Sequence, residues 1–300
     1  MTKEKVSPEV PADRQIASVA KGLVQLMRPR QWIKNGFVLA PLIFTGEFSV
    51  ALSVAKAVAA AFLFCCASSI VYIINDICDI ERDRAHPIKS KKRPLAAGTV
   101  TVRHAVYLAI LLCCVLGTGF MYFPTTGVVI GCYLLLNTAY SLYLKHQPVV
   151  DIFTIALGFV LRVYAGAEAL GVPVSGWMFV TTLCLALYLA AVKRRQELLL
   201  SGKDGRKVLK NYTVPLVDRY AEVSSTGSLL FYSLFVITER PDMVVTIPFV
   251  LYGLFRYWYI VEALDGGESP SDVLLGDLQL SLTVLLWLVV CITIIWRSGG

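Results

Sequence analysis

Residues 54–83 read VAKAVAAAFLFCCASSIVYIINDICDIERD, a long apolar run that ends in a cluster of acidic side chains. About 20 predominantly apolar residues suffice to cross the hydrocarbon core of a bilayer as a helix. The stretch therefore predicts a transmembrane helix over 54–76, with a group of carboxylates at its polar end.

The composition of the whole chain agrees with a membrane protein. Of its 300 residues, 56% are apolar and 16% are charged, against about 45–50% and 25% in soluble domains. The mean hydropathy is +0.66. A soluble globule could not bury this much apolar surface, and disorder, collagen and coiled coil fail for the same reason. In a membrane protein the positive charge, here a net +7, indicates which loops face the cytoplasm, so no nucleic-acid partner is expected.

Apolar stretches of spanning length recur along the chain, which predicts an all-α integral membrane bundle of nine transmembrane helices. The first stretch is the weakest because Pro41 and Gly46 interrupt it, so that eight spans are the alternative. The nine stretches lie near residues 33–50, 54–76, 104–122, 126–144, 150–169, 176–194, 222–238, 243–263 and 278–296.

The distribution of Lys and Arg orients this bundle. Three regions are rich in them: the segment up to Lys34, the loop 82–103, and the segment 193–219 at and after the end of the sixth span. With nine spans the three regions fall on one side, and the turns near 123–125 and 170–175 on the other side carry none. By the positive-inside rule the N-terminus and the basic loops are cytoplasmic, in a cell (inner) membrane. An eight-span chain without the first span would separate the N-terminus from the basic loops, which favours nine.

The chain divides into a polar tail (1–13), an amphipathic helix (14–30) and the membrane domain (31–300). At 100° per residue, Arg14, Lys21 and Arg28 gather on one helical face. Apolar side chains gather on the opposite face: Ile16, Val19, Ala20, Leu23 and Met27. This pattern predicts a helix lying in the membrane interface, and an ordinary solvated helix is the alternative.

The acidic cluster is the strongest candidate for chemistry. With Asn75 at zero, Asp79, Asp83 and Asp76 fall at about 40°, 80° and 100°, so that one face offers an amide and three carboxylates. Carboxylates this close repel each other, and a divalent cation removes that cost. Because Mg²⁺ prefers oxygen ligands and commonly shares them with phosphates, the cluster predicts a Mg²⁺–diphosphate site. A solvated acidic helix end is the alternative.

The loop after the acidic cluster is basic. Lys89 and Arg93 follow the carboxylates by few residues, so we expect them to hold the same diphosphate. A basic loop beside anionic lipid can also act only as a topology anchor.

Several motifs together carry a family resemblance. The pattern Asn75–Asp83 closing a span, followed by Arg93-Pro94-Leu95-Ala96-Ala97-Gly98, resembles the UbiA superfamily of membrane prenyltransferases. The resemblance implies nine helices around a catalytic chamber that opens to the cytoplasm. Three further motifs resemble the branch that transfers phosphoribosyl groups to decaprenyl phosphate: residues 28–35 (RPRQWIKN), 144–147 (LKHQ) and 193–197 (KRRQE). The resemblance covers about residues 26–296.

This resemblance assigns further site residues. Tyr140 and Lys145, at the end of the fourth span, match a tyrosine and a lysine that face the substrate in the family. Lys34 lies in the first branch motif and is a candidate for substrate binding. Asp151 and Arg162 share one face of the fifth span, with Arg162 about 16 Å inside it. An arginine at that depth faces a substrate chamber or forms an internal ion pair, and Asp151 is a catalytic candidate.

One motif departs from the aromatic prenyltransferases of the superfamily. Those enzymes have a second aspartate-rich, metal-binding motif at the sixth helix, where this chain has Lys193, Arg194 and Glu197 on one face. Two cations and one carboxylate suit a phosphate better than a second metal. The alternative is that these basic residues only end the span.

The predicted function is transfer of 5-phosphoribosyl from 5-phosphoribosyl 1-diphosphate to a polyprenyl (decaprenyl) phosphate, with Mg²⁺ as cofactor, to make a pentose donor for cell-wall polysaccharide. The alternatives are a UbiA-type aromatic prenyltransferase that uses a polyprenyl diphosphate, and a transporter or structural membrane protein. The oligomeric state does not follow from the sequence.

The predicted topology can be tested by labelling single cysteines in a cysteine-free background. Cysteines at Lys91 and Lys207 should react only from the cytoplasmic side, and one at Thr125 only from outside, because Lys and Arg accumulate on the cytoplasmic side. If the cysteines that replace Lys91 and Lys207 were labelled from opposite faces of the membrane, the count of nine spans would be wrong.

Overall fold

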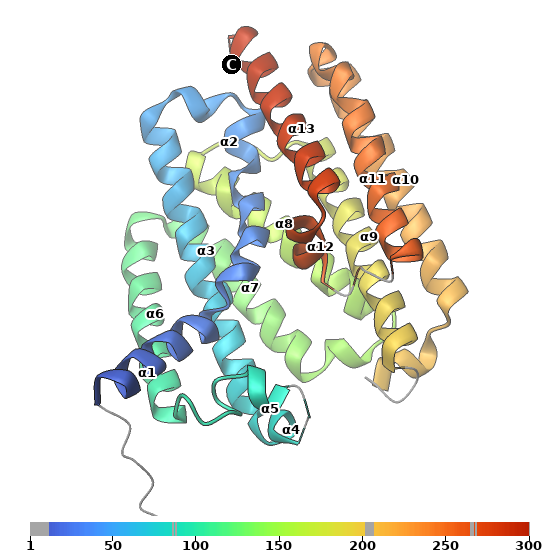
Figure 1. Ribbon diagram of the computed structural model, residues 1–300. Coiled ribbons are helices and arrows are strands. Elements are labelled where there is room, and N and C mark those ends of the chain that lie inside the picture. The colour runs from blue at the N-terminus through green and yellow to red at the C-terminus, as the bar shows by residue number, and fades with distance from the viewer. Residues whose placement is uncertain are drawn as a thin grey trace, which may run out of the picture. The chain divides into compact units, whose positions relative to one another are not determined.

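The structure, a computed structural model, describes residues 12–299 except 86, 88, 202–206, 265, 266 and 268. Nearly all of the predicted tail, and Lys203 and Arg206 of the third basic region, lie outside the described residues. Within the described ranges every regular element is a helix, which confirms the all-α prediction (Figure 1).

The chain forms two compact units, one of Met1–Pro29 with Cys66–Gly117 and one of Arg30–Cys65 with Thr118–Gly300. The first unit contains the N-terminal helix, the acidic cluster and the basic loop. Its elements are α1 (Ala12–Met27), the second part of α3 (Ala51–Cys78), α4 (Ile80–Arg84), α5 (Lys89–Lys92) and the first part of α6 (Val102–Tyr122).

The second unit holds the remaining helices, and within it α9 and α10 pack side by side (Figure 1). Besides the remaining parts of α3 and α6, its elements are η1 (Pro29–Leu39, 3₁₀), α2 (Ala40–Phe44), η2 (Glu47–Ser49, 3₁₀), α7 (Pro124–Leu142), η3 (Leu144–His146, 3₁₀), α8 (Val150–Leu170), α9 (Gly176–Ser201), η5 (Lys207–Asn211, 3₁₀), α10 (Val214–Glu239), η6 (Pro241–Thr246, 3₁₀), α11 (Ile247–Ala263), α12 (Pro270–Gly276) and α13 (Leu278–Arg297).

Eight helices among the described residues are long and apolar enough to cross a membrane. They correspond to the second to ninth predicted spans. Two of them extend well beyond the apolar runs: α9 continues to Ser201 and α10 begins at Val214. Their polar ends carry helical turns outside the hydrocarbon region, which a search for apolar residues misses.

The first predicted span, 33–50, is not one regular helix. It consists of η1, α2 and η2, with Pro41 in the first turn of α2 and Gly46 at a left-handed φ of 80°. Proline lacks an N–H, and a left-handed residue ends a helix, so both break the ladder of hydrogen bonds. At about 2.0 and 1.5 Å per residue, Pro29–Phe44 could still cover about 30 Å. The count of nine crossings stays a prediction.

The predicted amphipathic segment is helical, as α1, and packs within the first unit. Leu26 is buried, and Gly22 lies so close to the loop 94–100 that an added Cβ would meet the Val100 side chain at 2.5 Å. Lys21 and Val24 stay exposed. The helix is therefore held by the loop that follows the basic residues, and its position in the membrane interface stays a prediction.

The irregular segment η1 approaches α8 closely inside the second unit. A Cβ added at Gly166 would meet the backbone oxygen of Val38 at 1.9 Å, so only glycine fits here. The two backbones can come this close because Gly166 has no Cβ to separate them.

Gly166→Ala should therefore destabilise the protein by about 1–3 kcal/mol, the usual cost of overpacking. The apparent melting temperature in detergent measures this effect. Gly131→Ala is the matched control, because a Cβ there meets nothing within 4 Å. Equal melting temperatures for the two variants would contradict the close approach of η1 to α8.

Candidate functional site

The acidic cluster lies at a break between two helices. α3 ends at Cys78, α4 begins at Ile80, and Asp79 stands between them. Helical spacing nevertheless continues across the break, because Asp79 N donates to Asn75 O at 2.9 Å and Asp83 N donates to Asp79 O at 2.8 Å. The acidic side chains thus keep the relative positions that the sequence predicted.

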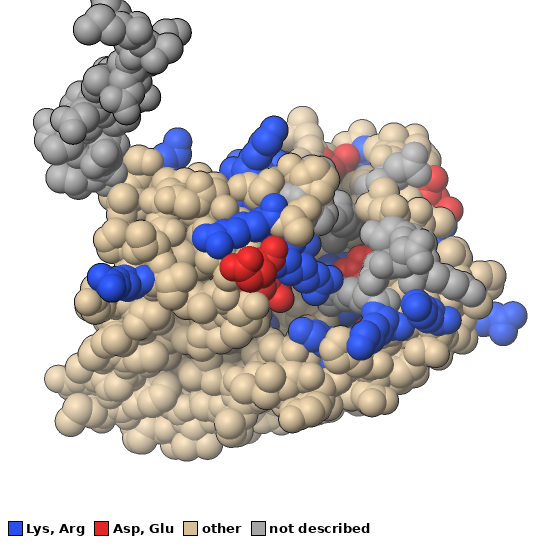
Figure 2. Space-filling view, turned by 90° about the horizontal axis from the view of Figure 1, so that it is seen from below, with Lys and Arg blue, Asp and Glu red and all other residues tan. Residues whose placement is uncertain are grey.

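Arg93 joins two of the carboxylates. Its Nη1 lies 2.6 Å from both Asp76 Oδ1 and Asp83 Oδ2, and both aspartates are buried. The Lys89 Nζ is 4.0 Å from Asp83. The basic loop and the acidic cluster are therefore in contact within the first unit, and their shared binding of a diphosphate stays a prediction. On the face seen in Figure 2, acidic side chains are few and lie among Lys and Arg.

Arg28 is a member of this cluster that sequence reasoning treated only as part of a motif and of a basic helix face. Its Nη2 lies 2.5 Å from Asp76 Oδ1, and its guanidinium stacks 4.8 Å from the ring centre of Tyr72. Arg28 has a positive φ of 53°, and the Ser69 hydroxyl donates to the preceding carbonyl, that of Met27. A proline directs the residue before it to extended backbone with negative φ, so Pro29 did not indicate the positive φ of Arg28.

The donor set fits Mg²⁺ in type, with guanidinium groups standing in for the metal. Among the described residues no three His, Cys, Asp or Glu side chains form a metal-ligand group. Two carboxylate oxygens converge on one cationic nitrogen at 2.6 Å, and oxygen is the ligand type that Mg²⁺ prefers. Asn75 and Asp79 are half-buried beside them.

A second charge cluster lies inside the second unit, around Arg194. Its Nε donates to Asp151 Oδ2 at 2.6 Å, its Nη1 to Glu197 at 2.5 Å and its Nη2 to the Tyr140 hydroxyl at 2.9 Å. Asp151 and Arg194 are both fully buried. The Arg194 guanidinium thus contacts three predicted site residues from three helices: Tyr140 on α7, Asp151 on α8 and Glu197 on α9.

Tyr212 completes this cluster, and sequence reasoning missed it. Its hydroxyl donates to Asp151 Oδ1 at 2.6 Å and accepts from Val149 N at 2.6 Å. Burial raises the pKa of the Tyr212 phenol, so the hydroxyl stays protonated and can donate. Val149 has a φ of 68°, a strained value for a β-branched residue, and the Tyr212 bond helps to hold it.

The structure changes the interpretation of the 193–197 motif. Lys193, Arg194 and Glu197 were expected to present one phosphate-binding face, whereas Arg194 turns inward and gives each guanidinium nitrogen a protein partner. Lys193 is half-buried, as are Lys34 and Lys145, and these three remain candidates for substrate phosphates.

Arg162 is buried without an acidic partner among the described residues. It donates to Asn35 Oδ1 at 2.8 Å, to Gly158 O at 2.7 Å and to the Tyr133 hydroxyl at 3.2 Å. Its guanidinium also lies 5.0–5.1 Å from the ring centres of Phe64, Tyr133 and Phe159. An aromatic cage with neutral acceptors thus takes the place of the internal ion pair that was one of the two expectations.

The apolar helices of spanning length, with charged side chains gathered in two clusters, define a multi-pass, all-helical membrane protein. The chain belongs to the UbiA prenyltransferase family, whose model matches residues 37–272. This confirms the resemblance seen in the sequence motifs.

Four relatives that match at least 90% of the chain carry one name, decaprenyl-phosphate phosphoribosyltransferase. The protein of that name from Mycolicibacterium smegmatis is 35% identical over 293 residues, which cover 90% of this chain and 91% of that one. The one from Corynebacterium glutamicum is 33% identical over 292 residues, with 92% and 86% covered.

A solved structure has the same fold. A UbiA homologue from Archaeoglobus fulgidus, bound to GPP and Mg²⁺, superposes with a TM-score of 0.70 at 21% identity, covering 91% of this chain and 99% of that one.

The buried pair of Asp151 and Arg194 should stabilise the fold. Arg194→Met should cost about 3–5 kcal/mol, because it leaves Asp151 as an uncompensated charge in the interior. Asp151→Asn should cost less, because Glu197 still pairs with Arg194. The double variant should cost less than the sum of the two. Melting temperatures in detergent measure all three, with Arg219→Met, an exposed position on α10, as the control. Additive losses would show that the two side chains are not coupled.

Proposed function

We propose that this protein transfers 5-phosphoribosyl from 5-phosphoribosyl 1-diphosphate to a polyprenyl phosphate and releases diphosphate. The observation that carries the proposal is an identity of 33–35% along about nine-tenths of the chain with proteins named decaprenyl-phosphate phosphoribosyltransferase. A decaprenyl chain is accordingly the proposed lipid, and a lipid-linked pentose for cell-wall polysaccharide the proposed product.

The acidic cluster of the first unit is the proposed binding site for the leaving diphosphate. Asp76, Asp79, Asp83 and Asn75 would hold Mg²⁺, which supplies neutralisation of the diphosphate charge when bound. Arg93, now bound to Asp76 and Asp83, and Lys89 would then donate to diphosphate oxygens. Lys89 and Arg93 would thereby have an anionic partner both without diphosphate, in the carboxylates, and with it.

The reaction needs little proton transfer. An oxygen of the lipid phosphate forms the new bond to the anomeric carbon of the ribose, and the bond from that carbon to the diphosphate oxygen breaks. The lipid phosphate is an anion near neutral pH, so no strong general base is required. Charge neutralisation and positioning by the protein should supply most of the rate.

The second unit supplies lysine side chains for the phosphates other than the leaving diphosphate. We propose Lys34, Lys145 and Lys193 as contacts of the ribose 5-phosphate or the lipid phosphate, each being half-buried. The network of Arg194, Asp151, Tyr140 and Glu197 would fix the ends of the helices that carry Lys145 and Lys193. Arg162 would form part of the substrate-binding wall.

We further propose that the basic loops and the N-terminus face the cytoplasm of a cell membrane, as the distribution of Lys and Arg predicts. The water-soluble ribosyl donor would then be reached from the cytoplasm.

A labelled-donor assay with purified protein tests the proposal. With polyprenyl phosphate and labelled 5-phosphoribosyl 1-diphosphate, labelled lipid should form and should require Mg²⁺. Asp79→Asn should lower kcat by about a hundredfold or more, because it removes a metal ligand and little volume.

Glu81→Gln is the matched control, since Glu81 is exposed on α4 and its one ion pair among the described residues is with Arg84. It should keep nearly normal activity. If the protein instead coupled a polyprenyl diphosphate to an aromatic acid and did not use the ribosyl donor, it would be an aromatic prenyltransferase and the proposal would be wrong. Absence of both activities together with a tolerated Asp79→Asn would favour a transporter or structural protein.

A further inference from the structure

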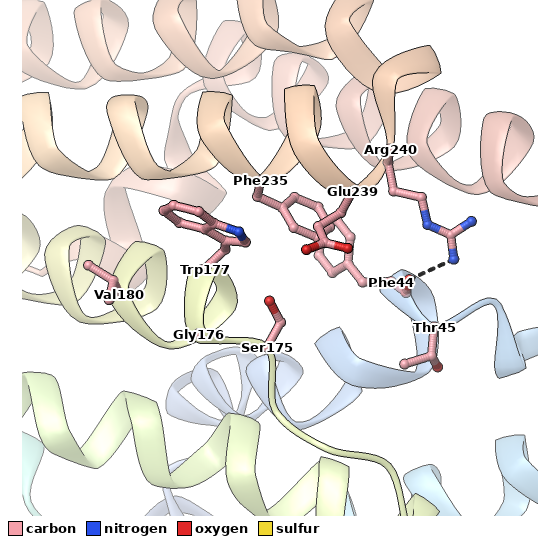
Figure 3. Close-up of a pocket in the computed structure, with 9 residues that line it drawn as sticks. All are labelled: Phe44, Thr45, Ser175, Gly176, Trp177, Val180, Phe235, Glu239 and Arg240. Carbon is pink, nitrogen blue, oxygen red and sulfur yellow. Dashed lines mark hydrogen bonds between the residues drawn. The ribbon is translucent and has the colours of Figure 1, made fainter.

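The second unit contains a cavity of about 720 Å³ that the proposed transfer reaction does not use. Its wall combines the end of α2, the start of α9 and the end of α10 (Figure 3). Phe44, Trp177 and Phe235 supply aromatic surface, and Ser175, Glu239 and Arg240 supply polar groups.

This cavity lies at the opposite end of α9 from the buried charge cluster. Gly176, which begins α9, precedes Arg194 by 18 residues, or about 27 Å of helix. That length approaches the roughly 30 Å thickness of the hydrocarbon core. The cavity is therefore at the other membrane boundary, where tryptophan is enriched and lipid headgroups are found.

Glu239 in this wall is exposed to solvent, and its place at a helix end carries only a modest electrostatic cost. It is the last residue of α10, where the carbonyl groups of the helix end already make the potential negative. Among the described residues no ion pair neutralises its carboxylate, which points across the cavity mouth toward Ser175 and Trp177 (Figure 3). A cation from outside the protein would remove this cost, and the neighbouring aromatic faces would also attract it.

Positive potential lies beside this carboxylate. The Arg240 side chain has one hydrogen bond among the described residues, a long one of 3.5 Å from its Nη2 to the Phe44 carbonyl. It also borders a smaller cavity of about 160 Å³ together with Asp242. The first N–H groups of α9, a helix of 26 residues, have no partner within the helix, and such a helix start attracts phosphate.

We propose that this cavity binds the headgroup of a phospholipid that carries an ammonium group, such as phosphatidylethanolamine. Arg240 and the start of α9 would contact the phosphate, Glu239 with the Trp177 and Phe235 rings would contact the ammonium, and the acyl chains would extend into the bilayer. Binding would join the ends of α2, α9 and α10, and so stabilise the second unit.

Lipid titration of the purified full-length protein in detergent tests this site. We would measure the melting temperature and the lipid retained in native mass spectrometry, with phosphatidylethanolamine and phosphatidylglycerol of identical acyl chains. Wild-type protein should bind phosphatidylethanolamine more tightly. Glu239→Gln should remove that preference, whereas Arg240→Gln should weaken binding of both lipids by about tenfold or more.

Control variants separate this site from general effects of charge. Glu222→Gln and Arg219→Gln, exposed near the other end of α10, should keep the wild-type preference, as should Glu239→Asp, which retains the carboxylate. Equal binding of the two lipids by wild-type protein would overturn the proposal. So would stronger binding of phosphatidylglycerol, or an unchanged preference in Glu239→Gln. None of these readings depends on transferase activity.

Discussion

A charged side chain that leaves water needs a partner inside the protein, and this requirement organises the polar residues of both units. In the first unit Asp76 and Asp83 are buried against Arg93, with Arg28 added on Asp76. In the second unit Arg194 is buried against Asp151 and Glu197. The apolar helices can carry ionic groups at their ends because oppositely charged groups from separate segments meet there.

Both clusters adjoin a residue with unfavourable backbone geometry. Arg28 (φ 53°) binds Asp76 and Val149 (φ 68°) binds Tyr212, and these are the non-glycine residues with positive φ in the described chain. Such conformations persist only where surrounding contacts hold them. In each case the chain changes direction beside a buried carboxylate, so the ionic contacts and the turns stabilise each other.

The two clusters suggest different contributions to the proposed chemistry. Arg93 and Lys89 are partly exposed and can exchange a carboxylate for a phosphate, because a divalent cation can take their place among the aspartates. Arg194 is fully enclosed, and each of its guanidinium nitrogens is already bonded. The first arrangement suits binding of an anionic leaving group, and the second suits positioning of helix ends.

The sequence by itself determined the class of fold and eight of the nine predicted spans, and it placed a basic loop a few residues after an acidic cluster. These follow from local properties: the length of apolar runs, helical spacing, and charges close together in the chain. Only the tertiary structure decided that η1 is irregular, that Arg28 binds Asp76, that Tyr212 binds Asp151, and that Arg162 lies among aromatic rings. Arg28 and Asp76 are 48 positions apart, Tyr212 and Asp151 are 61 apart, and Arg162 and its acceptor Asn35 are 127 apart. Such pairings depend on how helices pack, which no local pattern encodes.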